Sequence, residues 1–173
     1  MGFERIGGEE VWAGRIARVR VDRFRYDDGE EAEREIVAHP GAVAMVAHDG
    51  ERLYLVRQPR EAVDEQGLLE LPAGKVEDEG PLETGKRELA EEIGKVAGKW
   101  QLLTRFYTSP GFAAEEVHVY LATALENVEA GGAEEDERIE LVEVPLERLD
   151  EVIAECRDAK SLVGLLWFRA FHR

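Results

Sequence analysis

Apolar and polar residues alternate along the first part of the chain in the way that half-buried strands require. Residues 10 to 26 mix apolar side chains with charged ones, and a shorter run of the same kind covers residues 33 to 37. Asp27-Asp28-Gly29 lies between the two runs and is a turn signal. The pattern predicts a small antiparallel β unit at the N-terminus.

The pattern changes after residue 41, where continuous apolar runs begin. Ala42 to Ala47 and Leu53 to Val56 flank the hairpin signal His48 to Glu51. Further strands are predicted over residues 68–71, 100–107, 117–124 and 139–144, and the acidic stretch Glu129 to Glu137 is predicted to be a solvated loop. These runs indicate a second, larger mixed sheet.

Helical periodicity predicts three helices, over residues 81–93, 146–156 and 160–171. Pro81 is suited to the first turn of the first helix, and Gly94 is suited to end it. A mixed sheet with a few helices on its faces indicates an α/β sandwich.

The first predicted helix separates two kinds of side chain. Leu82, Leu89 and Ile93 share an apolar stripe, whereas three carboxylates at i, i+3 and i+4 share another face. These carboxylates are Glu88, Glu91 and Glu92. Hard divalent cations such as Mg²⁺ take oxygen ligands and are commonly shared between carboxylates and substrate phosphates. The face therefore predicts a magnesium site for phosphate chemistry, and the alternative is a solvated helix face with an ordinary ion pair from Arg87 to Glu91.

The surroundings of the helix favour the metal site. Leu71-Pro72-Ala73-Gly74 ends an apolar run, and the series Glu79, Arg87, Glu91-Glu92 and Gly94 follows. This series resembles the signature box of the Nudix hydrolases, which cleave nucleoside diphosphates linked to another moiety. The chain departs from that box in two places: the loop from Gly74 to Glu79 is one residue short, and Lys95 stands where an apolar residue usually follows the glycine.

Four further features resemble the ADP-ribose pyrophosphatase branch of that family. Three are short motifs: His39-Pro40-Gly41-Ala42-Val43, the pair of segments Val56 to Arg60 and Leu69 to Gly74, and Ser109-Pro110-Gly111-Phe112, whose Pro110 lies sixteen residues beyond Gly94. The fourth is the N-terminal strand unit. Pro110-Gly111 by itself is more often a plain turn.

The resemblance implies a Nudix-type α/β/α sandwich over residues 39–173, preceded by a dimerisation and substrate-covering unit over residues 1–38. It implies hydrolysis of ADP-ribose, or a related ADP-sugar, to AMP and ribose 5-phosphate with Mg²⁺ or Mn²⁺. Glu88, Glu92 and the carbonyl of Ala73 would hold the metal, and Glu91 would share a second ion. The metal would supply a hydroxide near neutral pH, so no covalent nucleophile is needed.

Other residues receive roles from the same comparison. Arg60, in preference to Arg57, is suited to grip a phosphate, because an arginine fork matches it. Glu70 would orient Arg60, bind a ribose hydroxyl or meet a metal indirectly. Further expectations are that Gly111 and Phe112 contact substrate, that Glu115 is a general base, and that Arg87 and Glu79 orient the box. For each side chain the alternative is an ordinary surface ion pair or loop residue.

Composition limits the remaining possibilities. The formal net charge of −16, from 22 basic and 38 acidic residues, argues against general binding of nucleic acid or anionic membrane. The single Cys156 is expected to be buried and cannot form an internal disulfide. The chain shows neither an apolar run near twenty residues nor a signal peptide, so it is expected in the cytoplasm.

Two alternative functions stay open. One is hydrolysis of another nucleoside diphosphate sugar or dinucleotide in place of ADP-ribose, because side chains outside the box choose the leaving moiety. The other is a non-catalytic ADP-ribose sensor.

Overall fold

The computed structural model describes residues 2–128 and 138–172, so the predicted loop Glu129 to Glu137 lies outside the described residues. The chain forms two compact units. The first combines residues 1–41 with residues 107–116, and the second combines residues 42–106 with residues 117–173. Residues 107–116 therefore belong with the N-terminal strands. The separate functions expected for residues 1–38 and 39–173 stay a prediction.

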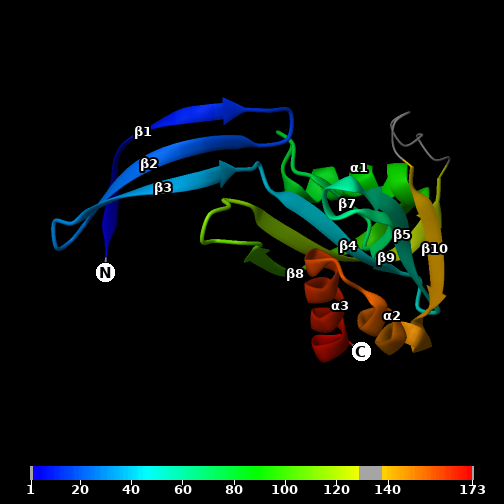
Figure 1. Ribbon diagram of the computed structural model, residues 1–173. Coiled ribbons are helices and arrows are strands. Elements are labelled where there is room, and N and C mark those ends of the chain that lie inside the picture. The colour runs from blue at the N-terminus through cyan, green and yellow to red at the C-terminus, as the bar shows by residue number, and fades with distance from the viewer. Residues whose placement is uncertain (1, 129–137, 173) are drawn as a thin grey trace. The chain divides into compact units, whose positions relative to one another are not determined.

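The first unit is a three-stranded antiparallel sheet in the order β1-β2-β3 (Figure 1). Its strands are β1 (Phe3–Ala13), β2 (Arg18–Tyr26) and β3 (Glu31–Ala38). β1 begins seven residues earlier than the alternation indicates, because Gly7 and Gly8 interrupt the apolar pattern and a register shift falls there. The predicted turn at Asp27-Asp28-Gly29 is present, with Gly29 at a φ of 87°.

The second unit contains a seven-stranded mixed sheet. Its path is β10-β5-β4-β9-β8; β6 pairs with β5 and β7 pairs with β4. Only the β4–β9 pairing is parallel among the described pairings. The strands are β4 (Ala42–His48), β5 (Arg52–Arg60), β6 (Glu65–Glu70), β7 (Ala73–Lys75), β8 (Lys95–Tyr107), β9 (Glu116–Asn127) and β10 (Glu140–Pro145).

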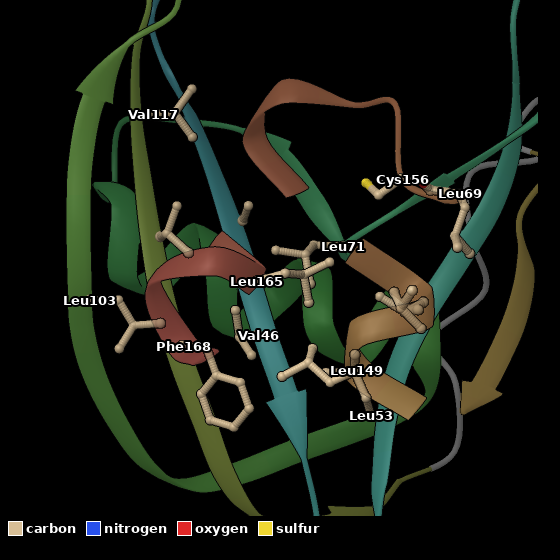
Figure 2. Close-up of a cluster of buried hydrophobic side chains, with 14 residues drawn as sticks. Val46, Leu53, Leu69, Leu71, Leu103, Val117, Leu149, Cys156, Leu165 and Phe168 are labelled. Atoms are coloured by element: carbon tan, nitrogen blue, oxygen red, sulfur yellow. Dashed lines mark hydrogen bonds between the residues drawn. The ribbon is translucent and has the colours of Figure 1, made fainter. Parts of the chain in front are cut away.

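Helices cover both faces of this sheet. Val43, Met45 and Ala47 of β4 join the buried cluster of α1 (Pro81–Ile93). Ala44 and Val46 point to the opposite face and join the cluster of α2 (Leu149–Glu155) and α3 (Ala159–Phe171), shown in Figure 2. Residues 42–47 of this central strand are therefore all apolar, because both of its faces are buried. The predicted α/β/α sandwich is confirmed.

Several predicted boundaries were wrong by a few residues: β6 begins at Glu65, β8 begins at Lys95, and the second helix begins later than expected. The second helix was expected from residue 146, but a short 3-10 turn over Leu146–Arg148 precedes α2. Cys156 follows that helix as its C-cap and is buried, as expected. Within the described residues, no helix is long and apolar enough to cross a membrane.

Candidate active site

Helix α1 presents the carboxylates because its other side is committed to the core. Leu89 and Ile93 are buried, and the absence of a side chain at Gly85 lets the helix lie close to Val43 and Met45 of β4. Pro81 occupies the first turn, and Gly94 ends the helix in the left-handed conformation (φ 64°). Both terminal signals expected from the sequence are confirmed.

Arg87 gathers four of the neighbouring glutamates around one guanidinium. Its Nη1 donates to Oε2 of Glu91 at 2.7 Å, and its Nη2 lies 2.9 Å from Oε1 of Glu88. Glu79 at 3.6 Å and Glu77 at 3.4 Å complete the group. The shortened loop therefore still brings Glu79 to Arg87. Desolvation acts to lower the pKa of Arg87, but the glutamates raise it overall.

The acidic side chains near Arg87 are the ones from which a metal site was expected. In the part of the chain that is described, no group of three or more acidic, cysteine or histidine side chains converges tightly enough to hold an ion. The carboxylates surround Arg87 instead, whose Nε and Nη2 are buried and make ion pairs without hydrogen-bond geometry. Glu77, Glu79, Glu88 and Glu91 offer only oxygen donors. Such donors fit a hard divalent ion, provided that some of them turn away from Arg87.

Glu92 joins the helix to the strand that precedes it. Its Oε2 accepts the main-chain N–H of Ala73 at 2.9 Å, so the first residue of β7 is fixed against the carboxylate face. Ala73 itself pairs with Ala44 of β4, which holds the segment on the sheet. The donor role of the Ala73 carbonyl toward a metal stays a prediction.

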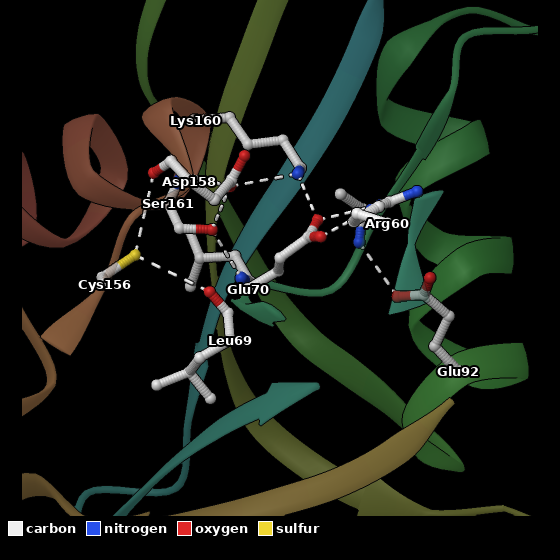
Figure 3. A network of polar contacts seen from close by, with 10 residues as sticks. Arg60, Leu69, Glu70, Glu92, Cys156, Asp158, Lys160 and Ser161 are labelled. Atoms are coloured by element: carbon white, nitrogen blue, oxygen red, sulfur yellow. Dashed lines mark hydrogen bonds and ion pairs between the residues drawn. The ribbon is translucent and has the colours of Figure 1, made fainter. Parts of the chain in front are cut away.

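Arg60 lies between two carboxylates, Glu70 and Glu92 (Figure 3). Its Nε and Nη2 donate to the two oxygens of Glu70 at 2.6 and 2.8 Å. This hydrogen-bonded pair is the main cause of the raised pKa of Arg60, and the charge of Glu92 adds to it. Of the three roles left open for Glu70, orientation of Arg60 is the one for which the contact exists. Arg57 instead pairs with Glu155 at 2.6 Å and donates to the carbonyl of Gly67.

The structure explains how Lys95 is accommodated at a position where the family pattern has an apolar residue. Its Nζ lies 4.4 Å from the centre of the Tyr54 ring and donates to Oδ1 of Asn127 at 2.8 Å. The ammonium thus covers an aromatic face where an apolar side chain would otherwise pack.

The segment 107–116 forms part of an aromatic pocket within the first unit. Hydrogen bonds between Val37 and the main chain of Phe112 and Ala114 join it to β3. The pocket holds about 450 Å³, and its walls include Phe3, Phe24, Tyr26, Arg34, Tyr107, Gly111 and Phe112. Gly111 and Phe112 were expected to contact substrate. The other members come from strands whose alternation carries no signal of a binding role.

Glu115 is also in the first unit, beside His39. Nδ1 of His39 lies 3.4 Å from Oε1 of Glu115 and accepts the N–H of Gly41 at 3.1 Å. The two contacts exclude one another, because an Nδ1 that accepts a hydrogen bond carries no proton to share with the carboxylate. Spacing along the sequence gave no reason to pair His39 with Glu115, since they lie 76 positions apart.

The chain is similar in sequence and in fold to known proteins. The sequence pattern of the NUDIX domain matches residues 38–162. The ADP-ribose pyrophosphatase of Bacillus subtilis is 40% identical over 95% of this chain and 91% of its own length. The methanol dehydrogenase activator of Bacillus methanolicus is 39% identical over the same shares. The crystal structure of an ADP compounds hydrolase matches 99% of this chain and 94% of its own, with a TM-score of 0.85 and 20% identity.

Proposed function

The chain belongs to the NUDIX domain family, and from this premise we propose that it hydrolyses the diphosphate of ADP-ribose, or of a related ADP-sugar, to AMP and ribose 5-phosphate. The observation that carries the proposal is the similarity to an ADP-ribose pyrophosphatase along nearly the whole chain. The carboxylate face of α1 supports it.

A divalent cation, Mg²⁺ or Mn²⁺, would neutralise the diphosphate and lower the pKa of a bound water. Glu88 and Glu92 would hold it with the Ala73 carbonyl, and Glu91 would share a second ion. Arg87 and Glu79 would keep these carboxylates in place. The Glu88 and Glu91 side chains are 15% and 33% exposed, so part of each carboxylate stays accessible to a metal and to substrate oxygens.

The chain's own side chains would do the remaining work. Arg60 would bind a phosphate oxygen with the donors that Glu70 leaves unused, and Arg57 would add positive charge nearby. Gly111 and Phe112 would contact the substrate, and Glu115 would take the proton from the attacking water. Loss of that proton would make the water a nucleophile. Its attack on one phosphorus would form a P–O bond, break the bond from that phosphorus to the bridging oxygen, and release AMP and ribose 5-phosphate.

A homodimer is the second part of the proposal. Val11, Trp12 and Ile16 are 52, 56 and 70% exposed, and all three lie at one end of the β1–β2 hairpin. A three-stranded sheet is small for a stable unit, and exposed apolar groups of this size mark interaction surfaces. A second copy of the chain would cover them. The cytoplasmic location stays a prediction.

A substrate panel separates the proposal from its alternatives. ADP-ribose, GDP-mannose, NADH and a diadenosine polyphosphate would be offered with Mg²⁺, and the released mononucleotide measured. A higher kcat/KM for ADP-ribose than for the other three compounds supports the proposal. A higher kcat/KM for one of the others would make that compound the preferred substrate. Tight ADP-ribose binding without turnover of any member would indicate the sensor.

Activation of a dehydrogenase is a second candidate, because one relative of nearly equal identity is named for it. The purified chain would be added to methanol dehydrogenase of Bacillus methanolicus, and methanol oxidation followed. If the wild-type chain speeds methanol oxidation and the Glu92→Gln variant does not, the activation depends on hydrolysis. Unchanged oxidation would exclude this candidate for that enzyme.

A further inference from the structure

Lys160, in the first turn of α3, belongs to a row of alternating charges that ends at the carboxylate face of α1. Its Nζ contacts Oε2 of Glu70 and lies 3.0 Å from Oδ2 of Asp158. Glu70 in turn holds Arg60, and Arg60 lies beside Glu92 (Figure 3). Asp158, the N-cap of α3, and Lys160 both lie outside the family box.

Glu70 needs both of its cations because it is buried. Its side chain is 0% exposed, and a carboxylate in such a position is costly unless charges and hydrogen bonds compensate it. Burial acts to raise the pKa of Glu70, but Arg60 and Lys160 together bring it below its usual value. Glu70 is therefore ionised, and its two oxygens fix the plane of the Arg60 guanidinium.

Lys160 is itself held rigidly, unlike a surface lysine. Asp158 caps α3 by accepting the N–H of Ser161 at 3.0 Å. The buried hydroxyl of Ser161 accepts the N–H of Leu71 at 2.7 Å, directly after Glu70 in the chain. The first turn of α3 is thus anchored to the segment that carries Glu70, and the Lys160 side chain is only 16% exposed.

We propose that Lys160 is a positioning residue for substrate binding: by holding Glu70 from the side of α3, it fixes Arg60 in the orientation that grips the diphosphate. The inference rests on the proposed function, since it needs Arg60 to bind the anionic part of the substrate. Without Lys160, one guanidinium would have to neutralise both Glu70 and Glu92. Arg60 would then have fewer donors for a phosphate.

Steady-state kinetics with ADP-ribose and Mg²⁺ test the inference in the full-length protein. Lys160→Met should raise KM roughly 3- to 30-fold, which lies within the coupling expected between residues of one network, while kcat changes less than about twofold. Lys160→Arg should restore most of the loss because it keeps the charge. Arg169→Met is the control: it removes another cation of α3, which forms an ion pair of 2.8 Å with Asp150 of α2, and it should leave KM unchanged.

A double substitution shows whether Lys160 acts through Arg60. Adding Lys160→Met to Arg60→Met should not raise KM further, whereas independent contributions to binding would multiply and overturn the inference. Should Lys160→Met fail to fold, Lys160→Gln takes its place with the same expectations. If KM is unchanged in the Lys160 variant but raised in Arg60→Met, the inference about Lys160 is overturned and the binding role of Arg60 stands. An unchanged KM in Arg60→Met refutes the binding role of Arg60 itself and the inference with it.

Discussion

Gly74 and Glu88 lie so close together that a Cβ atom at position 74 would come within 2.2 Å of the Glu88 carboxyl carbon. No side chain other than hydrogen fits there while Glu88 keeps its position. The glycine after Leu71-Pro72-Ala73 is therefore required by the space that a carboxylate of α1 occupies.

Gly74→Ala should displace Glu88 and lower kcat roughly 100-fold, the loss that a misplacement of about 1 Å can cause. Gly67→Ala is the matched control, because a Cβ there would meet no atom within 4 Å. The measurement is AMP release from ADP-ribose by both variants at saturating Mg²⁺. Full activity of Gly74→Ala would show that Glu88 can leave its position without consequence.

Glu115→Gln should lower kcat by roughly 100-fold, the smaller end of what general base catalysis contributes. Metal binding should stay intact, and calorimetry with Mn²⁺ checks this. Glu51→Gln, in the exposed hairpin between β4 and β5, controls for the loss of one charge. Undiminished turnover of Glu115→Gln would remove this residue from the mechanism.

Trp12→Glu should convert a dimer into a monomer, because a charge in an apolar interface is costly to bury. Sedimentation equilibrium of the wild type should give twice the mass of the chain, and that of the variant should give the single mass. Deletion of residues 1–38 should also yield a monomer with impaired substrate binding, but it removes Val37, which hydrogen-bonds to residues 112 and 114. A variant that stays dimeric would place the interface elsewhere.

Asp49→Asn should destabilise the hairpin at neutral pH but not in acid. Partial desolvation acts to raise the pKa of Asp49, but hydrogen bonds from Tyr54, Arg52 and Glu51 bring it down to about 2. A folded-state pKa below the unfolded value gives stability that is full above about pH 4 and is lost toward about pH 2.

Urea unfolding would measure the effect of Asp49→Asn. After allowance for solvent screening at this exposed site, the wild type should be about 1 kcal/mol more stable at neutral pH, and the gap should shrink at about pH 3. Asp150→Asn, exposed in α2, controls for removal of one charge. A gap that does not change with pH would mean that the Asp49 carboxylate charge is not the stabilising feature.

Local patterns predicted most of the sandwich. β4 could be recognised because residues 42–47 are all apolar. This pattern has its cause in the structure, where Val43 to Ala47 are fully buried between the two faces of the sheet. Helix α1 was bounded correctly because Pro81 and Gly94 are terminal signals with a direct backbone cause. The start of β1 could not be predicted, since Gly7 and Gly8 carry no side chains to alternate.

The polar network around Glu70 was only partly visible in the sequence. Arg60 and Glu70 lie ten positions apart on adjacent strands, and their pairing could be anticipated. Lys160 and Asp158 could not, because 90 positions separate Lys160 from Glu70 and only the packing of α3 brings them together. The pairing of His39 with Glu115 escaped for the same reason.

The most direct test of the proposed function is release of AMP from ADP-ribose with and without Mg²⁺, by the wild type and by Glu92→Gln. Glu83→Gln is the control, since Glu83 lies on the same helix and pairs with Lys86. The wild type and the control should release AMP only with the metal, and this release should collapse in Glu92→Gln. Equal release by Glu92→Gln, or release that does not need a divalent metal, would contradict it.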